Sequence, residues 1–359
     1  MKSIEKIIEA VRGGERIEAD DALTLWREAP LWSLAGLAVE LKRRKSGDKV
    51  FYNRNFHIEP SNVCIFDCKF CSYRRHRGEE GSWDYSLEEI LRDVKSRRNS
   101  GATEIHIVGG VHPDRDIYYY AEMIRSIARV MPDVCIKAFT AAELHYMIRK
   151  AGLSLVEGLT LLKEAGMESI PGGGAEIFDE QLRQQLCPMK CSADEWLALH
   201  GEAHRLGISS NATMLYGHVE QIEHRIDHLM RLRRQQDLTG GFNAFIPLKY
   251  RSSHNAMSSI GETSVVDDLR TLAMSRIILD NVPHLKAYWV MYGKEVAELA
   301  LAFGADDIDG TIDDSTKIYS MAGAADVRPT MSIAEIERIC QAAGWRAVER
   351  DTHYNEIKR

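Results

Sequence analysis

The sequence lacks three features that would each indicate a particular class of protein. Its longest apolar run, 31–41, is too short to cross a bilayer, so we expect no membrane insertion. Acidic residues outnumber basic ones, 53 to 46, and the net charge of −7 argues against a nucleic-acid partner. The seven cysteines are few and odd in number for 359 residues, which argues against a secreted disulfide scaffold. The N-terminus has no apolar signal core, so the sequence favours a cytoplasmic protein.

What the chain does contain, from residue 56 onward, is a repeated alternation of β-rich and helical segments. The β-rich runs are 56–58, 104–108, 134–140, 169–171, 210–216, 244–250, 285–291 and 305–309. Helical patterns fill most intervals, at 86–100, 118–130, 193–206, 222–238, 265–279 and 332–343. Eight such units predict an α/β protein with a closed (β/α)8 TIM-type barrel, and an open doubly wound sheet is the alternative.

The first fifty residues follow a different, helical pattern. Asp20 and Asp21 are placed to cap a helix that ends before Pro30, and a second helical pattern covers 31–45. No linker rich in Pro, Gly or Ser marks a further domain. We therefore expect an N-terminal helical extension over 1–50, packed outside or below the barrel, and one barrel with its C-terminal segment over 51–359.

The strongest chemical signal is a cysteine triplet, Cys64, Cys68 and Cys71, directly after the first predicted strand. Barrels place active sites on loops at the C-terminal ends of their strands. Three thiolates on one such loop can hold three irons of a [4Fe–4S] cluster and leave the fourth iron open to a substrate. Two alternatives stay open: a buried stripe on a helix, and a zinc site completed by His57 or His76.

The triplet has the spacing Cx3Cx2C, with the aromatic Phe70 before its last cysteine, and so resembles the signature of the radical S-adenosylmethionine (SAM) superfamily. The wider sequence, from about residue 20 to the C-terminus, resembles the aminofutalosine synthase family of the futalosine pathway to menaquinone. This likeness lies in 57–62, 104–113, 136–141, 171–176, 210–218 and 307–311. Segments 136–141 and 307–311 favour that family over its sister, cyclic dehypoxanthine futalosine synthase.

The resemblance implies a specific chemistry. Cys64, Cys68 and Cys71 would hold the [4Fe–4S] cluster, and SAM would chelate its fourth iron. One electron from a flavodoxin- or ferredoxin-type donor would cleave SAM to methionine and a 5′-deoxyadenosyl radical. In the aminofutalosine synthase family this radical adds to 3-[(1-carboxyvinyl)oxy]benzoate, giving 6-amino-6-deoxyfutalosine and CO2 or bicarbonate. SAM is then a co-substrate of a transferase. A non-catalytic zinc-binding protein is the alternative from another class.

Residues at other strand ends are candidates for binding SAM. The resemblance assigns Gly109 and Gly110 to its amino group, and a plain β-to-α turn is the alternative. Glu176 follows three glycines and would bind a ribose or cap the next helix. Strand alternation turns Asn211 and Thr213 toward the lumen, where similar family positions contact SAM and where bound water is the alternative.

The remaining candidates concern the adenine, the substrate and proton transfer. Phe70 and, with less weight, Tyr73 would stack near the adenine or simply pack against the barrel. Positive charge after the sixth predicted strand would suit substrate carboxylates, and it comes from Lys249, Arg251 and His254. Many relatives carry a different segment there, and a solvated basic loop is the alternative. Candidates for acid–base roles are Glu143, His145 and His218. Two inert thiols are expected at Cys187 and Cys191.

Overall fold

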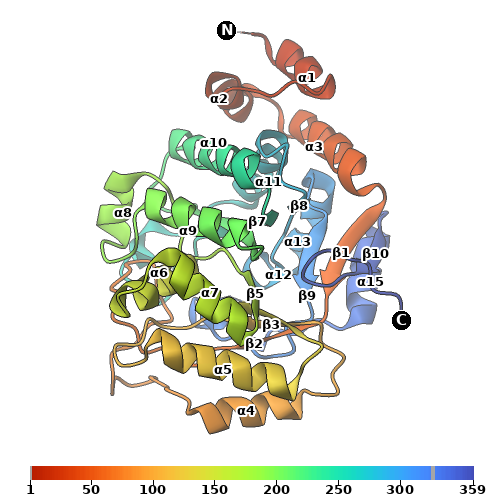
Figure 1. Cartoon of the computed structure of the whole chain (residues 1–359). Helices are drawn as coiled ribbons and strands as arrows, with labels where there is room; N and C mark the ends of the chain where they lie inside the picture. The colour runs from red at the N-terminus through yellow and green to blue at the C-terminus, as the bar shows by residue number, and fades with distance from the viewer. Residues whose placement is uncertain (1, 325–327) are drawn as a thin grey trace.

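A computed structural model describes residues 2–324 and 328–359, and it shows a curled parallel sheet surrounded by helices (Figure 1). Seven parallel strands follow one another in chain order as neighbours. They are β2 (Asn55–Ile58), β3 (Glu104–Ile107), β4 (Cys135–Ala138), β5 (Met167–Ile170), β6 (Ser209–Tyr216), β7 (Phe242–Lys249) and β8 (His284–Leu285). This sequential order excludes the doubly wound alternative, in which the strand order reverses at a switch point. The sheet is a partial barrel of the TIM type.

A second parallel sheet, in the order β10–β1–β9, lies against the edge of the first. Its strands are β1 (Lys49–Asn53), β9 (Asp307–Gly310) and β10 (Arg346–Glu349). Only Arg54 separates β1 from β2, and one isolated parallel bridge joins Lys286, just after β8, to Asp307 of β9. The strands thus form two linked sheets where the sequence predicted one closed sheet.

Helices cover the outside of the sheets (Figure 1). Their bounds are α4 (Leu87–Ser96), α5 (Ile117–Val130), α6 (Ala141–Lys150), α7 (Leu155–Ala165), α8 (Glu180–Leu186), α9 (Ala193–Arg205), α10 (Ile222–Thr239), α11 (Val265–Ile278), α12 (Trp289–Tyr292), α13 (Lys294–Ala300), α14 (Ile318–Met321) and α15 (Ile333–Ala342). There are also two short 3-10 helices. Ser258–Ile260 lies between β7 and α11, and Leu301–Phe303 lies between α13 and β9. Within the described residues, none of the helices has the length and apolar character that crossing a bilayer requires.

The predicted segments agree with the structure unevenly. Each β-rich run overlaps a strand, but the run 285–291 is strand only at Leu285 and then turns into α12. Apolar residues of α12 such as Val290 and Met291 are buried, and a short apolar run does not distinguish a buried strand from a buried helix. The strands β1 and β10 were not predicted, and β1 begins inside the expected N-terminal extension.

The N-terminal extension forms three helices, α1 (Ile4–Arg12), α2 (Ala19–Glu28) and α3 (Leu31–Ser46). The α2 helix packs against α10 and the α3 helix against α11, so the extension lies outside the ring of barrel helices (Figure 1). The expected cap of α2 is wrong, because Glu18 is its N-cap and Asp20 and Asp21 lie in its first turn. There the two carboxylates still favour the positive end of the helix dipole.

Candidate active site

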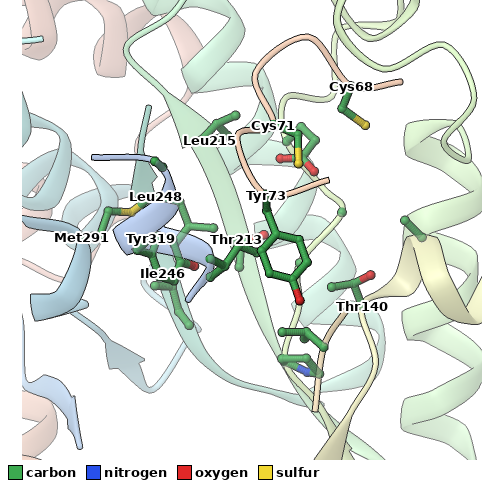
Figure 2. Close-up of a pocket in the computed structure, with 18 of the residues that line it drawn as sticks. Cys68, Cys71, Tyr73, Thr140, Thr213, Leu215, Ile246, Leu248, Met291 and Tyr319 are labelled. Atoms are coloured by element: carbon green, nitrogen blue, oxygen red, sulfur yellow. The ribbon is translucent and has the colours of Figure 1, made fainter. Parts of the chain in front are cut away.

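A cavity of about 270 Å3 opens among the loops that follow β2, β3, β4, β5 and β7, and it reaches down to inward-facing strand residues (Figure 2). Most of the residues predicted from the sequence line it. They are Cys64, Cys68, Phe70, Cys71, Tyr73, Gly109, Gly110, Glu143, Glu176, Asn211, Thr213, Lys249 and Arg251. Side chains of His145, His218 and His254 do not line this cavity, nor do those of Cys187 and Cys191.

The cysteine triplet lies on an irregular loop, as predicted, and the alternative of a buried stripe on a helix is wrong. Backbone hydrogen bonds fix this loop from two sides. Lys69 donates its N–H to the carbonyl of Leu186 at the end of α8, at 2.9 Å, and accepts one from Ala256 at 3.0 Å. Figure 2 shows Cys68 and Cys71 on this loop, beside the strand that carries Thr213 and Leu215. The thiols therefore border the cavity on a loop that the barrel holds in place.

The surroundings of the thiols favour their use as ligands. The Cys64 sulfur accepts the backbone N–H groups of Phe66 and Val111, at 3.4 and 3.3 Å. Burial nevertheless raises the pKa of Cys64 and the pKa of Cys68, so neither thiol ionises readily without a cation. The buried ammonium of Lys190 lies close enough to oppose this rise at Cys68. A metal centre would supply the positive charge that three buried thiolates require.

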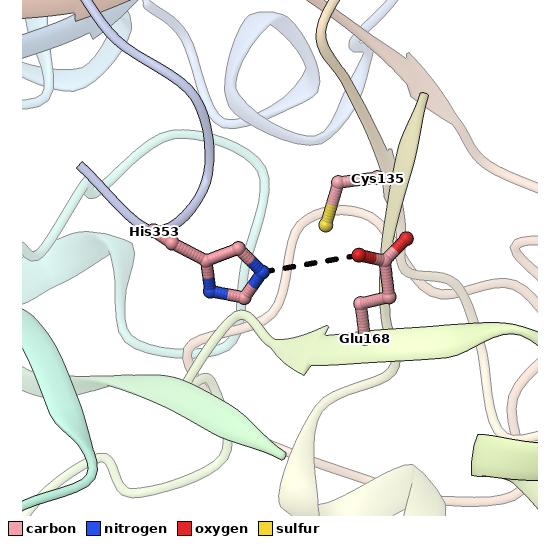
Figure 3. A group of neighbouring side chains, drawn as sticks. All are labelled: Cys135, Glu168 and His353. Carbon is pink, nitrogen blue, oxygen red and sulfur yellow. Dashed lines mark ion pairs between the residues drawn. The ribbon is translucent and has the colours of Figure 1, made fainter. Parts of the chain in front are cut away.

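The spacing of the ligands argues against a single metal ion at the triplet. Zinc–sulfur bonds of about 2.3 Å place the ligands of one zinc ion about 4 Å apart. Across the described chain, the one group of three potential ligands within 4.8 Å of one another is Cys135, Glu168 and His353, far from the triplet in sequence (Figure 3). The triplet is therefore more widely spaced than one zinc ion needs, and the exposed His76 contacts Arg74 instead.

The group in Figure 3 is explained without a metal. Glu168 and His353 are half-exposed, and their closest N and O atoms are 3.8 Å apart. The nearby carboxylate of Glu168 raises the pKa of His353, as expected for an ion pair. Burial raises the pKa of the neighbouring Cys135 thiol to about 12, so it is neutral. The three residues form a surface ion pair beside a buried thiol.

Gly109 and Gly110 are required by close packing of the chain on itself. A Cβ atom at Gly110 would lie 2.3 Å from the carbonyl oxygen of Val63, and one at Gly109 would lie 2.9 Å from that of Ser61. The Gly110 N–H donates to the Ser61 carbonyl at 2.7 Å, and the Gly109 N–H donates to Glu143 at 3.0 Å. The turn after β3 therefore touches the segment that leads into the cysteine loop, and its backbone lines the cavity.

Glu176 and Lys190 form a largely buried ion pair in the cavity wall. Asp179 caps α8 by accepting the Leu182 N–H at 2.8 Å, so the capping alternative for Glu176 is wrong. Glu176 adopts a left-handed backbone conformation, with φ of 50°, which is uncommon for a residue with a side chain. The Lys190 ammonium also lies over the Phe70 ring, 5.2 Å from its centroid.

Strand β6 presents Asn211 and Thr213 to the cavity, while Ala212 and Met214 point outward and are fully buried. Thr213 donates its hydroxyl to the carbonyl of Gly172 at 2.8 Å. The glycine turn after β5 therefore lies directly against β6. Both polar side chains are nine-tenths buried or more, so a ligand would meet them out of contact with bulk water.

The cations predicted to bind substrate carboxylates are already engaged. Lys249 donates to Asp268 and to the carbonyl of Thr263, at 2.8 and 2.9 Å. Arg251 lies 3.2 Å from Glu262. His254 adopts a left-handed backbone with φ of 59° and is exposed. The geometry does not favour these three residues as free anchors for an anion.

The histidines predicted for proton transfer lie outside the cavity in other contacts. His145 is 3.4 Å from Glu195, and His218 is 3.1 Å from Glu220. Glu143 differs, because it lines the cavity and is buried. Burial raises the pKa of Glu143 to about 7, although Thr140 and Gly109 donate hydrogen bonds to its carboxylate. Of the three candidates, Glu143 alone is placed to exchange a proton with a ligand.

Polar side chains deep in the lumen were not among the residues predicted from the sequence. These residues line the lower part of the cavity: His57, Glu104, His106, Lys137, Lys286, Tyr288 and Asp309. Their signal was present, because ionisable residues stand at alternate positions inside otherwise apolar strands, as Glu104 and His106 do around Ile105. The sequence indicated His57 only as a possible zinc ligand.

Comparison with protein families agrees with this geometry. Residues 58–232 match the radical SAM superfamily, and residues 239–358 match the CofH/MqnC C-terminal region. The chain is 43% identical to aminodeoxyfutalosine synthase of Thermus thermophilus, over 98% of this chain and 95% of the relative. The chain belongs to the radical SAM superfamily. Membership implies a [4Fe–4S] cluster and SAM, and the first match begins just before the cysteine loop.

Other members of the radical SAM superfamily are nearly as similar. A 5-amino-6-(D-ribitylamino)uracil–L-tyrosine 4-hydroxyphenyl transferase of Methanosarcina mazei is 37% identical over 99% of this chain and 92% of the relative. Cyclic dehypoxanthine futalosine synthase of Streptomyces coelicolor is 35% identical over 99% and 89%. The solved structure of methylornithine synthase covers 95% of this chain and 97% of its own with a TM-score of 0.75, and at 18% identity it shows the fold alone.

Proposed function

We propose that this radical SAM enzyme is an aminodeoxyfutalosine synthase. Such an enzyme joins the 5′-deoxyadenosyl group of SAM to 3-[(1-carboxyvinyl)oxy]benzoate and forms 6-amino-6-deoxyfutalosine, methionine and CO2 or bicarbonate. The observation that carries the proposal is the 43% identity to the Thermus thermophilus synthase over 98% of the chain. The corresponding values are 37% for the uracil–tyrosine transferase and 35% for the cyclic dehypoxanthine futalosine synthase.

Cys64, Cys68 and Cys71 hold the cluster in this proposal. Three thiols on one anchored loop, facing the cavity and spaced too widely for one zinc ion, support this assignment. A cluster held by these thiols would supply the single electron that cleaves SAM reductively. The Lys190 ammonium, buried beside Cys68, offsets part of the negative charge of the thiolates. The electron donor is of the flavodoxin or ferredoxin type.

The turn after β3 and strand β6 would hold SAM. Carbonyl groups of Gly109 and Gly110 would accept hydrogen bonds from its ammonium group, which is a donor. Asn211, Thr213 and Glu176 line the opposite wall and suit the ribose hydroxyls. Phe70 packs near the adenine. Glu143 holds the turn through Gly109 and, with its pKa near neutral, can hold a proton beside the amino group.

The barrel is closed around this site in the proposal, because a primary carbon radical must be shielded from water. The parallel bridge from Lys286 to Asp307 and the pairing of β1 with β9 support an eight-stranded ring. Burial of Asn211 and Thr213 to 3% exposure supports a dry upper lumen.

The test uses the anaerobically reconstituted protein with a reductant, SAM labelled in its adenosyl group, and 3-[(1-carboxyvinyl)oxy]benzoate. We expect label in 6-amino-6-deoxyfutalosine. Label found mainly in free 5′-deoxyadenosine, with product formed from dehypoxanthine futalosine or from 5-amino-6-(D-ribitylamino)uracil and tyrosine, would assign the protein to one of the two sister activities.

The cysteine assignment has its own matched comparison. Cys68→Ser is expected to lose most of its bound iron and sulfide and all adenosyl transfer. Cys340→Ser removes another buried thiol, in α15 and outside the cavity, and is expected to keep both. A colourless wild-type protein that binds zinc and no iron after reconstitution would support the zinc alternative instead.

A further inference from the structure

The floor of the cavity is a row of polar side chains on three neighbouring strands. In the sheet register, His57 of β2 pairs with His106 of β3, and His106 pairs with Lys137 of β4. All three line the cavity, whereas their neighbours Ile105 and Ile107 point into the apolar layer behind the sheet. One row of the barrel thus places two imidazoles and an ammonium side by side.

Within the part of the chain that the structure describes, neither imidazole has a hydrogen-bond partner. Both ring nitrogens of His57 are buried without one, and the partly buried His106 makes none to any described residue. Their ring centroids are 4.4 Å apart. Burial lowers the pKa of His57 to about 4 and lowers the pKa of His106 as well, so both rings are neutral. Each neutral ring offers one N–H donor and one acceptor, and leaving such groups buried and unpaired is costly.

The neighbouring groups add further donors. Lys137 donates one hydrogen bond to Glu104, at 2.6 Å, and Lys286 donates one to Asp309. Each ammonium has three N–H groups, so each has further N–H groups to donate. The hydroxyl of Tyr288 is buried and also unpartnered. The carboxylate of Glu104 is further occupied by the Thr352 hydroxyl, at 2.7 Å. Donors therefore outnumber free acceptors at this floor.

We propose that the donor floor, formed by His57, His106, Lys137, Lys286 and Tyr288, binds the ring carboxylate of an aromatic substrate. A carboxylate has four acceptor positions and fits a site with surplus N–H and O–H groups. The identity of the substrate rests on the proposed function. Its enolpyruvyl double bond must meet the adenosyl carbon near the cysteine loop, so the ring carboxylate lies at the far end. That group is kept in the product, whereas the other carboxylate is lost.

Among the described residues, the cations higher in this cavity each have a carboxylate partner, as Arg74 has in Asp67. Lys190 is paired with Glu176, Lys249 with Asp268, and Arg251 with Glu262. Each of these pairs is already neutral overall. The floor also pairs its ammonium groups with carboxylates. Among the described residues that line the cavity, the floor adds two neighbouring imidazoles, those of His57 and His106, that make no hydrogen bond within the protein. His106 lies in the middle of the row, between His57 and Lys137, so it is the donor whose substitution tests the proposal.

The experiment measures binding, in the cluster-loaded protein with SAM and without reductant, by titration calorimetry under argon. The two ligands are 3-[(1-carboxyvinyl)oxy]benzoate and 2-phenoxyacrylate, which lacks only the ring carboxylate. For His106→Phe we expect the Kd of the first ligand to rise about tenfold or more, the factor for one hydrogen bond to a charged group. The Kd of 2-phenoxyacrylate should change by less than about twofold, because that ligand never uses the floor.

Two further variants complete the design. His106→Asn keeps a side-chain N–H and is expected to recover part of the lost affinity, which also guards against a folding defect in His106→Phe. His353→Phe changes a histidine outside the cavity and should leave both Kd values unchanged. An equal loss of affinity for both ligands, or no loss for either, overturns the floor assignment. Substrate binding that depends on His106, without any adenosylated product, would contradict the proposed function and leave the carboxylate site standing.

Discussion

Glu143 shows how one side chain joins a helix end to the active-site cavity. It completes a capping box with Thr140 at the start of α6, and its other oxygen accepts the Gly109 N–H from the turn after β3. Three donors converge on this carboxylate, yet burial still raises its pKa to about 7. A helix cap could be predicted from Thr140 and Glu143 alone, but the contact with Gly109 could not, because it joins two separate β–α turns.

Glu143 should make stability depend on pH. Its folded pKa of about 7 lies above the ordinary value of 4.5, so the folded state holds the proton more tightly than the unfolded chain. Its contribution to the free energy of unfolding is therefore greatest below about pH 4.5. As the pH rises to about 7, up to ~3 kcal/mol of this contribution is lost. In Glu143→Gln this dependence should vanish. Urea unfolding at pH 5, 6 and 7 measures the difference from wild type, and a difference that does not change with pH would contradict the assignment.

At the scale of elements, the sequence predicts the strands well and the contents of the lumen poorly. Alternation identified Asn211 and Thr213 as facing inward, because Ala212 and Met214 between them are plainly apolar. His106 and Lys137 follow the same alternation, yet a polar residue in a short strand reads equally well as exposed. Only the register of β2, β3 and β4 brings His57, His106 and Lys137 into one row. Pairing between distant strands is not encoded in any local pattern.

The turn after β3 should be intolerant of a side chain. In Gly110→Ala the new Cβ would lie 2.3 Å from the Val63 carbonyl oxygen, so the segment leading to Cys64 must move. We expect a loss of about 1–3 kcal/mol in the free energy of unfolding and a clear fall in iron bound per chain. Gly36→Ala is the control, since nothing lies within 4 Å of its Cβ in α3, and alanine favours a helix by up to ~1 kcal/mol. Full iron content in Gly110→Ala would show that the loop tolerates the shift.

At the scale of the whole molecule, the C-terminal segment closes the end of the barrel opposite the cysteine loop. The strand β10 pairs with β1, and just after it Arg350 and Thr352 reach the first residues of β9 and β3. Arg350 binds Asp307 and lies 4.0 Å from Glu104, which also binds Lys137 of the donor floor. The chain therefore uses its last residues to neutralise the carboxylates beneath the lumen. Composition and motif spacing do not reveal this, because the partners lie 43 residues apart for Arg350 and Asp307 and 248 apart for Thr352 and Glu104.

Arg350 should consequently contribute far more to the free energy of unfolding than Arg346, which lies on the same segment. Its side chain is fully buried and donates to Asp307 at 2.7 and 2.9 Å. Arg350→Met leaves Asp307 buried with the Tyr354 hydroxyl and the Asp309 N–H as close donors but without its guanidinium partner, and we expect a loss of about 3–5 kcal/mol. Arg346→Met removes an exposed pair with Asp48 and should cost less than about 1 kcal/mol. Denaturant unfolding of the two variants provides the comparison. If both variants lose the same free energy of unfolding, the stability of this end of the barrel does not depend on Arg350. Adding Asp307→Asn to Arg350→Met should restore part of the loss, because it removes the charge that the first substitution leaves unpaired.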